Sequence, residues 1–168
     1  MPRPDLTRVP SYYHRYIAQV QGDDLSQALR RHHSELLTYL ETLPEQRWAY
    51  RYAESKWSIK ELVQHIIDAE RIFAYRALTF ARKDTTPLPG FEENDYAAAS
   101  EADRRTGADL LKELKAVQES STLLFESFTP EQLEANGTAN GNPVYVSAIG
   151  FILVGHSLHH LSILKERY

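Results

Sequence analysis

The chain has 168 residues, a length that fits one domain with a sizeable core. Apolar residues make up 42% of it and charged residues 25%, a globular composition that excludes disordered and low-complexity proteins. The 19 Lys and Arg against 23 Asp and Glu form no basic block, and the absence of cysteine excludes disulfide scaffolds, iron–sulfur clusters and thiol nucleophiles.

Neither a secretory leader nor a membrane-spanning segment is predicted. Residues 1–10 carry three prolines and no apolar core, unlike a signal peptide. The longest apolar stretch, residues 144–154, has about half the length needed to cross a bilayer. We therefore expect a cytoplasmic protein that contacts no membrane.

Four amphipathic helices are predicted, and all 8 prolines lie outside them. Residues 1–22 are expected to form an extended N-terminal tail, and residues 23–168 a single domain. The helices are expected over residues 24–43, 58–82, 106–128 and 147–167. A capping box, Ser58 with Glu61, marks the start of the second helix. A short extra turn is expected from Thr129 and a brief extended segment over residues 144–146, but no strand is predicted with confidence.

Helices of this number and length predict an all-α fold, a four-helix bundle. About 14 residues join the first two helices, and about 20 residues with two prolines and a glycine join the second to the third. At ~3.3 Å per extended residue, the longer connection can recross the length of a helix. The second and third helices can therefore run parallel, joined by a long crossover.

Three histidines occupy positions where the helical pattern expects apolar residues. His156 and His160 are four residues apart on the apolar face of the fourth helix, a spacing that lets both rings reach one metal ion. His65 lies on the apolar face of the second helix. Each could be an ordinary core histidine with one hydrogen bond, but burying three uncompensated imidazoles costs several kcal/mol. A single metal ion would compensate all three, so a metal site is predicted at these residues.

Three neutral nitrogen ligands leave a coordination position open, as in catalytic rather than structural sites. Imidazole suits zinc, nickel, copper and iron, of which zinc or nickel is expected. The zincin motif is excluded, because that motif has a glutamate directly after its first histidine and this chain has Ser157 there.

Four further residues are candidates for the pocket or for contacts with the metal ligands. Asp68, three residues after His65, could accept the free ring N–H of that histidine. Arg76 lies on an inward face and could bind a substrate carboxylate or another anion, or form an ion pair with a nearby acid. His159 lies one position off the ligand face, and His32 could line the pocket or be a core residue.

The two remaining histidines, His14 and His33, are expected on the surface.

Three segments resemble the DinB/YfiT-like superfamily of metal-binding four-helix bundles: KWSIKELVQHIIDAER at residues 56–71, LPGF at 88–91 and GHSLHH at 155–160. The resemblance extends from about Leu25 to the C-terminus. It implies a long crossover after the second helix, a homodimer, and a divalent metal, commonly zinc or nickel, held by His65, His156 and His160. Members resemble metal-dependent hydrolases, and some are similar to transferases or isomerases that use low-molecular-weight thiols. Nothing in this chain maps onto a thiol-cofactor pocket.

We therefore expect a divalent-metal-dependent enzyme acting on a small molecule. In one mechanism, metal-bound water attacks an amide or ester, as in a hydrolase. In the other, the metal binds the thiolate of a low-molecular-weight thiol and directs it at an electrophile. A non-catalytic metal-binding protein with a stress-response partner is a third hypothesis. Nucleic-acid binding is not expected from the acidic charge balance.

Overall fold

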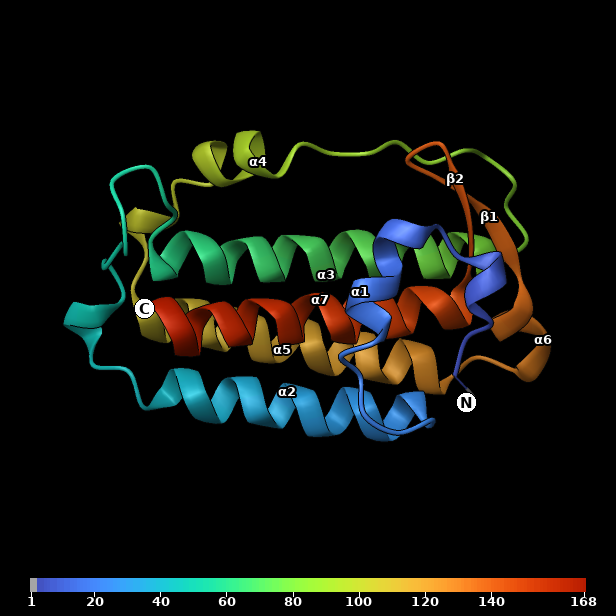
Figure 1. The fold of residues 1–168 in the computed structure, drawn as a ribbon, viewed down its shortest axis with the longest axis horizontal. Coiled ribbons are helices and arrows are strands. Elements are labelled where there is room, and N and C mark those ends of the chain that lie inside the picture. Colours follow the sequence, from blue (N-terminus) through green and yellow to red (C-terminus); the bar gives the residue numbers. More distant parts are fainter. Residues whose placement is uncertain (1–2) are drawn as a thin grey trace.

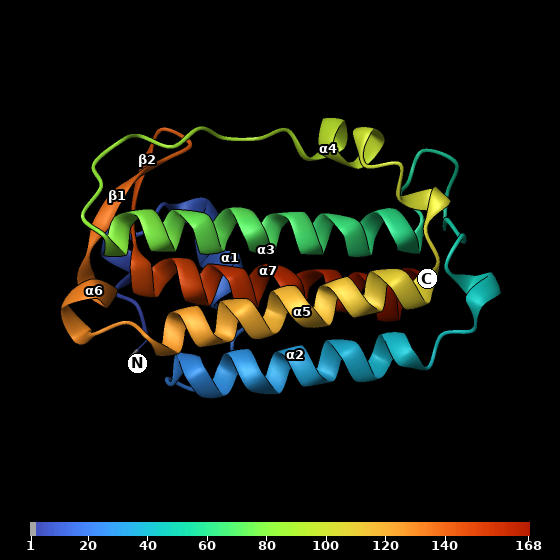
Figure 2. The same cartoon turned by 180° about the vertical axis from the view of Figure 1, so that it is seen from behind.

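The computed structural model describes residues 3–168 as a bundle of four long helices (Figure 1). These helices are α2 (Leu25–Glu41), α3 (Ile59–Ala81), α5 (Gly107–Glu126) and α7 (Val146–Arg167). α3 packs against both α5 and α7, and α2 packs against the same two helices, as the view from behind also shows (Figure 2). The predicted all-α four-helix bundle is confirmed.

The connection from α3 to α5 recrosses the full length of the bundle, so that these two neighbouring helices run parallel (Figures 1 and 2). The predicted long crossover is thus confirmed. It contains a short helix, α4 (Glu93–Ala99), and a 3₁₀ turn at Ala102–Arg104, which the sequence analysis did not predict. The residue before α4 is Glu92, which is not among the preferred N-cap residues, so the sequence offered little to mark this start.

Side-chain caps set the starts of three long helices. Asp24 accepts a hydrogen bond from the Gln27 amide at the start of α2. At α3, the Ser58 hydroxyl accepts from the Glu61 amide (3.1 Å) and the Glu61 carboxylate accepts from the Ser58 amide (2.7 Å). Thr106 caps α5 in the same way as Asp24 caps α2. The predicted starts of these helices agree with the structure because each depends on a local hydrogen bond between neighbouring residues.

The N-terminal segment is not the extended tail that we predicted. Its described part forms 3₁₀ turns at Leu6–Arg8 and Ser11–Tyr13 and a short helix α1 (His14–Ile17), whereas residues 1 and 2 lie outside the described residues. Tyr13, Ile17 and Val20 are buried, and α1 packs against α7. Because these apolar residues recur every three or four positions, one helical turn buries all of them together.

A β-hairpin closes the end of the bundle where α7 begins. After α6 (Pro130–Glu134), β1 (Asn136–Ala139) pairs antiparallel with β2 (Asn142–Tyr145). Asn140 and Gly141 form the turn with φ of 51° and 72°. The sequence analysis expected only a brief extended segment at residues 144–146 and overlooked this Asn-Gly pair, whose tolerance of positive φ favours a two-residue hairpin.

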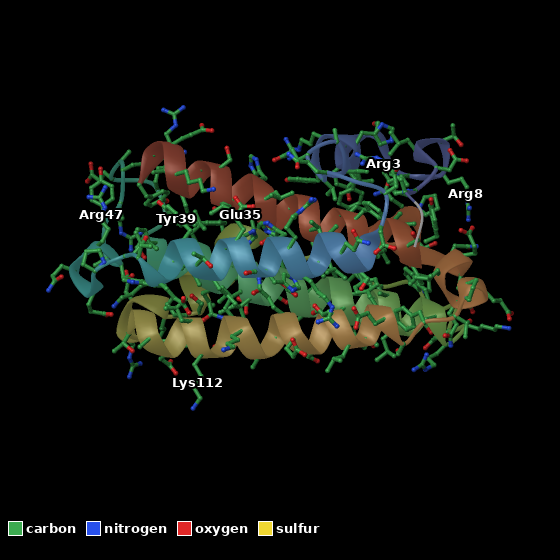
Figure 3. The ribbon with its side chains drawn as sticks, turned by 90° about the horizontal axis from the view of Figure 1, so that it is seen from below. Arg3, Arg8, Glu35, Tyr39, Arg47 and Lys112 are labelled. Carbon is green, nitrogen blue, oxygen red and sulfur yellow. The ribbon has the colours of Figure 1, made fainter. Side chains whose placement is uncertain are left out.

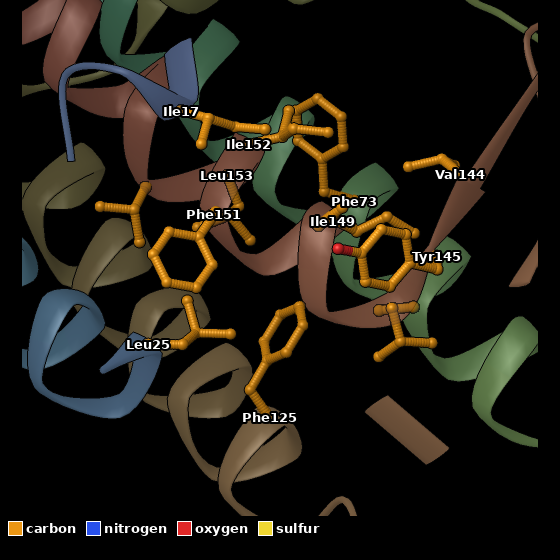
Figure 4. Packing of buried hydrophobic residues seen from close by; sticks show 14 of the residues in the cluster. Ile17, Leu25, Phe73, Phe125, Val144, Tyr145, Ile149, Phe151, Ile152 and Leu153 are labelled. Atoms are coloured by element: carbon orange, nitrogen blue, oxygen red, sulfur yellow. The ribbon is translucent and has the colours of Figure 1, made fainter. Parts of the chain in front are cut away.

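The core has two apolar clusters, one at each end of the bundle. Figure 4 shows the cluster near the hairpin, where Leu25, Phe125 and Phe151 meet between three helices. The other cluster includes Leu36, Trp48 and Leu114. Along α2, α5 and α7, the residues between the two clusters include buried polar side chains: His32, His33, Gln118, Ser121, Thr122, Ser157 and His160. The middle of the bundle is therefore a polar layer.

Helix α7 is the central helix of the fold. Its length and mean hydropathy would allow it to cross a membrane, but 72% of that apolar window is buried inside the bundle. Glu35 and Tyr39 of α2 lie on the side that faces α7 (Figure 3). The Lys165 ammonium group binds the Glu35 carboxylate at 2.8 Å, and the Tyr39 hydroxyl donates to the Leu164 carbonyl at 3.2 Å. Polar contacts thus fix α2 against the C-terminal half of α7, which carries two of the candidate ligands.

Candidate metal centre

The structure brings His65, His156 and His160 together in the polar layer between α3 and α7. The Nε2 atom of His156 lies 3.1 Å from the Nε2 atom of His65 and 3.1 Å from that of His160. One ligand atom from each of the three residues lies within 4.8 Å of the other two. Three imidazoles from two helices therefore direct nitrogens at one point, as the sequence predicts.

Three aromatic side chains pack against these rings, and two of them come from outside α3 and α7. The Trp57 ring packs against the His65 ring with centroids 4.8 Å apart. The edges of Tyr16 and Phe73 meet the His156 ring at 5.7 and 5.9 Å. Trp57 precedes the cap of α3 and Tyr16 belongs to α1, so the start of α3 and the N-terminal segment both help to orient the rings.

Burial keeps the three imidazoles neutral. Desolvation lowers the pKa of His65 to about 4, and desolvation together with the neighbouring rings and Arg15 lowers the pKa of His156 to about 3. The pKa of His160 is lowered well below its usual value for the same reasons. A neutral imidazole offers a lone pair, which is the form that binds a metal ion.

These residues fit a divalent metal ion. A ring nitrogen carries either a proton or an in-plane lone pair, so the Nε2 atom of His156 cannot make a full hydrogen bond with both of the Nε2 atoms that lie 3.1 Å from it. A cation at the meeting point satisfies nitrogens that the protein leaves poorly paired, and a set of three imidazoles suits zinc, nickel, copper or iron.

The centre opens on one side to a pocket of about 220 Å³. His160 lines it, together with Trp57, Leu62 and Ile163, and Asn94 of α4 lies at its border. Ser55 and Lys56 add polar groups, and no Asp or Glu is among the described residues that line it. A small molecule can therefore approach the histidines from the side of the 52–57 loop and α4.

Two of the other predicted residues lie next to the centre without bonding to its rings. Asp68 accepts a hydrogen bond from the Gln64 amide at 2.9 Å, not from His65 as we proposed, and burial raises its pKa. The His159 ring is half-buried, with its centroid 5.3 Å from that of His160. Burial lowers the pKa of His159 as well, and no hydrogen bond to its ring is found in the described part of the chain.

Two predicted residues lie away from the centre. His32 is buried in α2, where burial lowers its pKa to about 4 and neither ring nitrogen has a partner among residues 3–168. It is a core histidine and does not join the other three. Arg76 is buried with 4% exposure and donates to the Pro89 carbonyl of the crossover at 2.8 Å. The ion pair that we considered for it is not found among the described residues.

A second buried polar cluster was missed. His33, predicted on the surface, is buried, and its Nε2 atom lies 3.4 Å from a carboxylate oxygen of the fully buried Glu70. Helical spacing could have indicated both positions. Ile66, Glu70 and Phe73 share one face of α3, as Leu29, His33 and Leu36 share one face of α2.

This architecture and the three convergent histidines define a four-helix bundle with a candidate metal centre. The family model described as the DinB superfamily matches residues 28–164, and the chain belongs to this family. The predicted resemblance is thereby confirmed.

Comparison with known proteins gives consistent relatives. A curated protein of Oceanobacillus iheyensis named "Putative metal-dependent hydrolase OB0413" is 28% identical over 127 residues, 74% of this chain and 72% of its own length. YfiT from Bacillus subtilis, described as a probable metal-dependent hydrolase with an unusual four-helix bundle topology, superposes with a TM-score of 0.75 at 16% identity, covering 99% of this chain and 90% of its own. A mycothiol-dependent maleylpyruvate isomerase gives a TM-score of 0.69 at 13% identity and covers 82% of this chain but 58% of its own. The two structural matches are evidence for the fold.

Proposed function

We propose that the protein is a divalent-metal-dependent hydrolase of a small molecule. The observation that carries this proposal is the convergence of three neutral imidazoles, two buried and one partly buried, beside a pocket that His160 lines. The name of the Oceanobacillus iheyensis relative and the description of YfiT support the same reaction class. A structural metal site would instead close its fourth position with a protein ligand, and no such fourth group is found among the described residues.

His65, His156 and His160 would hold the ion through their Nε2 atoms. When bound, such an ion supplies Lewis acidity, which lowers the pKa of a coordinated water or thiol and polarises a carbonyl. The protein contributes fixed geometry, because α3 and α7 hold the rings and Trp57, Tyr16 and Phe73 press against them.

The pocket at His160 would orient the substrate. Its polar groups include the Asn94 amide and the Lys56 ammonium, which can donate hydrogen bonds to a carbonyl or carboxylate. The described lining residues include no Asp or Glu that could serve as a general base. Zinc or nickel is our proposal for the ion, on the basis of the imidazole ligands.

A second candidate is transfer or isomerisation with a low-molecular-weight thiol. The structural likeness to an isomerase described as mycothiol-dependent favours it, because a metal that activates water can also activate a thiol. Both reactions would use the same three histidines. The two candidates differ only in what occupies the open position.

One experiment tests these proposals together. The protein is purified without added metal, its metal content is measured, and it is assayed on ester and amide substrates and on electrophiles with a low-molecular-weight thiol. Hydrolysis that His156→Ala abolishes supports the hydrolase. Saturable thiol binding, with charge-transfer bands in the cobalt- or nickel-substituted protein, supports the second candidate. A metal-loaded protein inactive in every assay would favour the non-catalytic hypothesis.

The homodimer predicted from the family resemblance and the cytoplasmic location stay predictions. Sedimentation at micromolar concentration tests the first, and a monomer there would contradict it.

A further inference from the structure

A second pocket, of about 270 Å³, lies between α3 and the crossover. Ile72, Tyr75 and Arg76 form its helix side, and residues 88–91 of the crossover form the opposite wall. None of the three candidate metal ligands lines it. Arg76 follows His65 by eleven residues on the same helix, which places the two about 16 Å apart along its axis. This pocket is therefore separate from the metal centre.

The crossover wall of this pocket is held in place by the hairpin. The Leu88 amide donates to the Thr138 carbonyl at 2.9 Å, and the Asn140 amide donates to the Leu88 carbonyl at 3.0 Å. Gly90 lies so close to Asn140 that a β-carbon there would be 2.2 Å from the side-chain oxygen. These contacts pre-form the pocket, because residues 88–90 are fixed to β1 and the turn without any ligand.

Three arginines line this pocket and the adjoining hollow of about 560 Å³, and two of them are neutralised. Arg71 binds Glu113 at 2.6 Å, and Arg105 binds Asp109 at 2.7 Å as well as Glu113. Arg76 is the most deeply buried of the three, yet no carboxylate of residues 3–168 lies within 4.0 Å of it. A buried cation is ordinarily paired, so this one calls for an anion.

The one hydrogen-bond partner of Arg76 among residues 3–168 is too weak to be its full complement. The Pro89 carbonyl accepts from Nη2 at 2.8 Å and so occupies one of five N–H donors. A neutral carbonyl leaves the charge of the guanidinium uncompensated. The Phe73 ring lies 5.8 Å from the guanidinium carbon, near the limit for a cation–π contact. The hydrogen bond that holds the crossover at Pro89 therefore does not by itself explain why an arginine is buried here.

We propose that this pocket binds a small organic monoanion, a carboxylate on a flat apolar body, through Arg76. The planar guanidinium matches a carboxylate with two parallel hydrogen bonds. The walls suit an apolar body, because Leu88, Pro89 and Phe91 face Ile72 and Tyr75. One uncompensated positive charge neutralises one negative charge, whereas a phosphate dianion would keep half of its charge in an apolar pocket.

The test is a titration of the purified full chain with benzoate, followed by amide shifts in ¹H–¹⁵N NMR spectra. We expect saturable shifts at residues 72–76 and 88–91. Benzamide, the neutral isostere, and phenyl phosphate should each bind at least tenfold more weakly than benzoate. Tighter binding of phenyl phosphate would overturn the carboxylate assignment, and equal binding of benzamide would overturn the pairing with Arg76.

Matched variants locate the site. Arg76→Gln should weaken benzoate binding at least tenfold, whereas Arg82→Gln, at the exposed arginine that follows the last residue of α3 and does not line the pocket, should leave it unchanged. If Arg76→Gln does not fold, the Ile72→Trp variant tests the site instead, because the larger side chain fills the pocket while Arg76 is kept. His156→Ala should bind benzoate normally, so failure of the metal proposal would not affect the result. Undiminished binding in Arg76→Gln or Ile72→Trp, or no saturable shifts at these residues, would refute the inference.

Discussion

The backbone of α7 at Gly155 lies directly against the carbonyl group of Tyr16. A β-carbon at Gly155 would be 2.1 Å from the Tyr16 carbonyl oxygen and 2.4 Å from its carbon. This close approach brings the Tyr16 ring to the His156 and His159 rings, with centroids 5.7 Å apart in both cases. Because Gly155 has no side chain, the N-terminal segment can lie against α7, and this position also places the Tyr16 ring beside the candidate metal centre.

Gly155→Ala should destabilise the protein, although alanine normally favours a helix over glycine by about 1 kcal/mol. The new methyl group meets backbone atoms that cannot move aside, so we expect a net loss of about 1–3 kcal/mol in urea unfolding. Gly150→Ala is the comparison in the same helix, because its methyl group meets only side-chain atoms, of Leu25 at 2.3 Å and Phe125 at 3.0 Å, which can rotate aside more easily than backbone. A Gly155→Ala protein as stable as Gly150→Ala would show that the approach of α1 is not close.

Metal binding should stabilise the folded protein, because the three histidines meet only there. An ion present at 100 times its dissociation constant raises the free energy of unfolding by about 2.7 kcal/mol. We expect zinc or nickel to raise the thermal midpoint and a chelator to reverse the effect. His160→Ala should lose this response and His159→Ala should keep it; equal responses in the two variants would contradict the ligand set.

Hydrogen bonds around His33 assign the proton of Glu70. The Thr122 hydroxyl donates to the Gln118 carbonyl at 2.9 Å, so it accepts from the Nδ1–H of His33 at 3.1 Å. The His33 Nε2 lone pair then faces Glu70, 3.4 Å away, and only a protonated carboxyl can donate to it. Burial raises the pKa of Glu70 to about 8 and lowers that of His33 to about 3, which agrees with a neutral pair.

This pair makes stability depend on pH in two opposite ways. The pKa of Glu70 is raised on folding, so its contribution is complete below about pH 4.5 and is lost as the pH rises through about 8. The pKa values of His32 and His33 are lowered on folding, so their contribution is present above about pH 6.5 and is lost on acidification. Between pH 6.5 and 8, Glu70 is the only one of these three residues that binds more protons in the folded chain than in the unfolded chain.

Glu70→Gln should make the free energy of unfolding nearly independent of pH between pH 6.5 and 8. Wild-type stability should fall by up to about 1.4 kcal/mol per pH unit between pH 6.5 and 8, because the unfolded chain releases the proton that the folded state keeps. Glutamine keeps the shape and can donate to His33, so the variant should fold and stay nearly constant there. Urea midpoints at several pH values measure this, and parallel curves for the two proteins would rule out a protonated Glu70.

The N-cap of α3 should contribute more to the free energy of unfolding than the N-cap of α5. Ser58 is fully buried, and its hydroxyl both accepts from the Glu61 amide and donates to Asp103 at 2.7 Å. Ser58→Ala should cost about 2 kcal/mol, the upper end for a lost cap, since it also leaves Asp103 without this donor. Thr106→Ala, at the exposed cap of α5, should cost about 1 kcal/mol in the same urea titration. Equal losses would show that the Asp103 contact contributes nothing.

Local patterns explain why much of this fold was predictable. The starts at Asp24, Ser58 and Thr106 follow from hydrogen bonds that span three residues, and the apolar stripes follow from the helical repeat. The hairpin could also have been predicted from a local pattern, since Asn140 and Gly141 supply the two positive φ angles of its turn. The burial of Tyr13, Ile17 and Val20 was not predicted, because it depends on the close contact at Gly155.

The sequence by itself determined four helices, their apolar faces, and the presence of His65, His156 and His160 on those faces, since each follows from residues a few positions apart. Only the tertiary structure decided that His65 meets His156 across 91 positions, that His33 faces Glu70 inside the bundle, and that Arg76 lies under the crossover with no acid of residues 3–168 beside it. Helical periodicity specifies which way a side chain faces on its own helix. Which residue it meets depends on how whole helices rotate and slide against each other, and the packing of the complete core decides that.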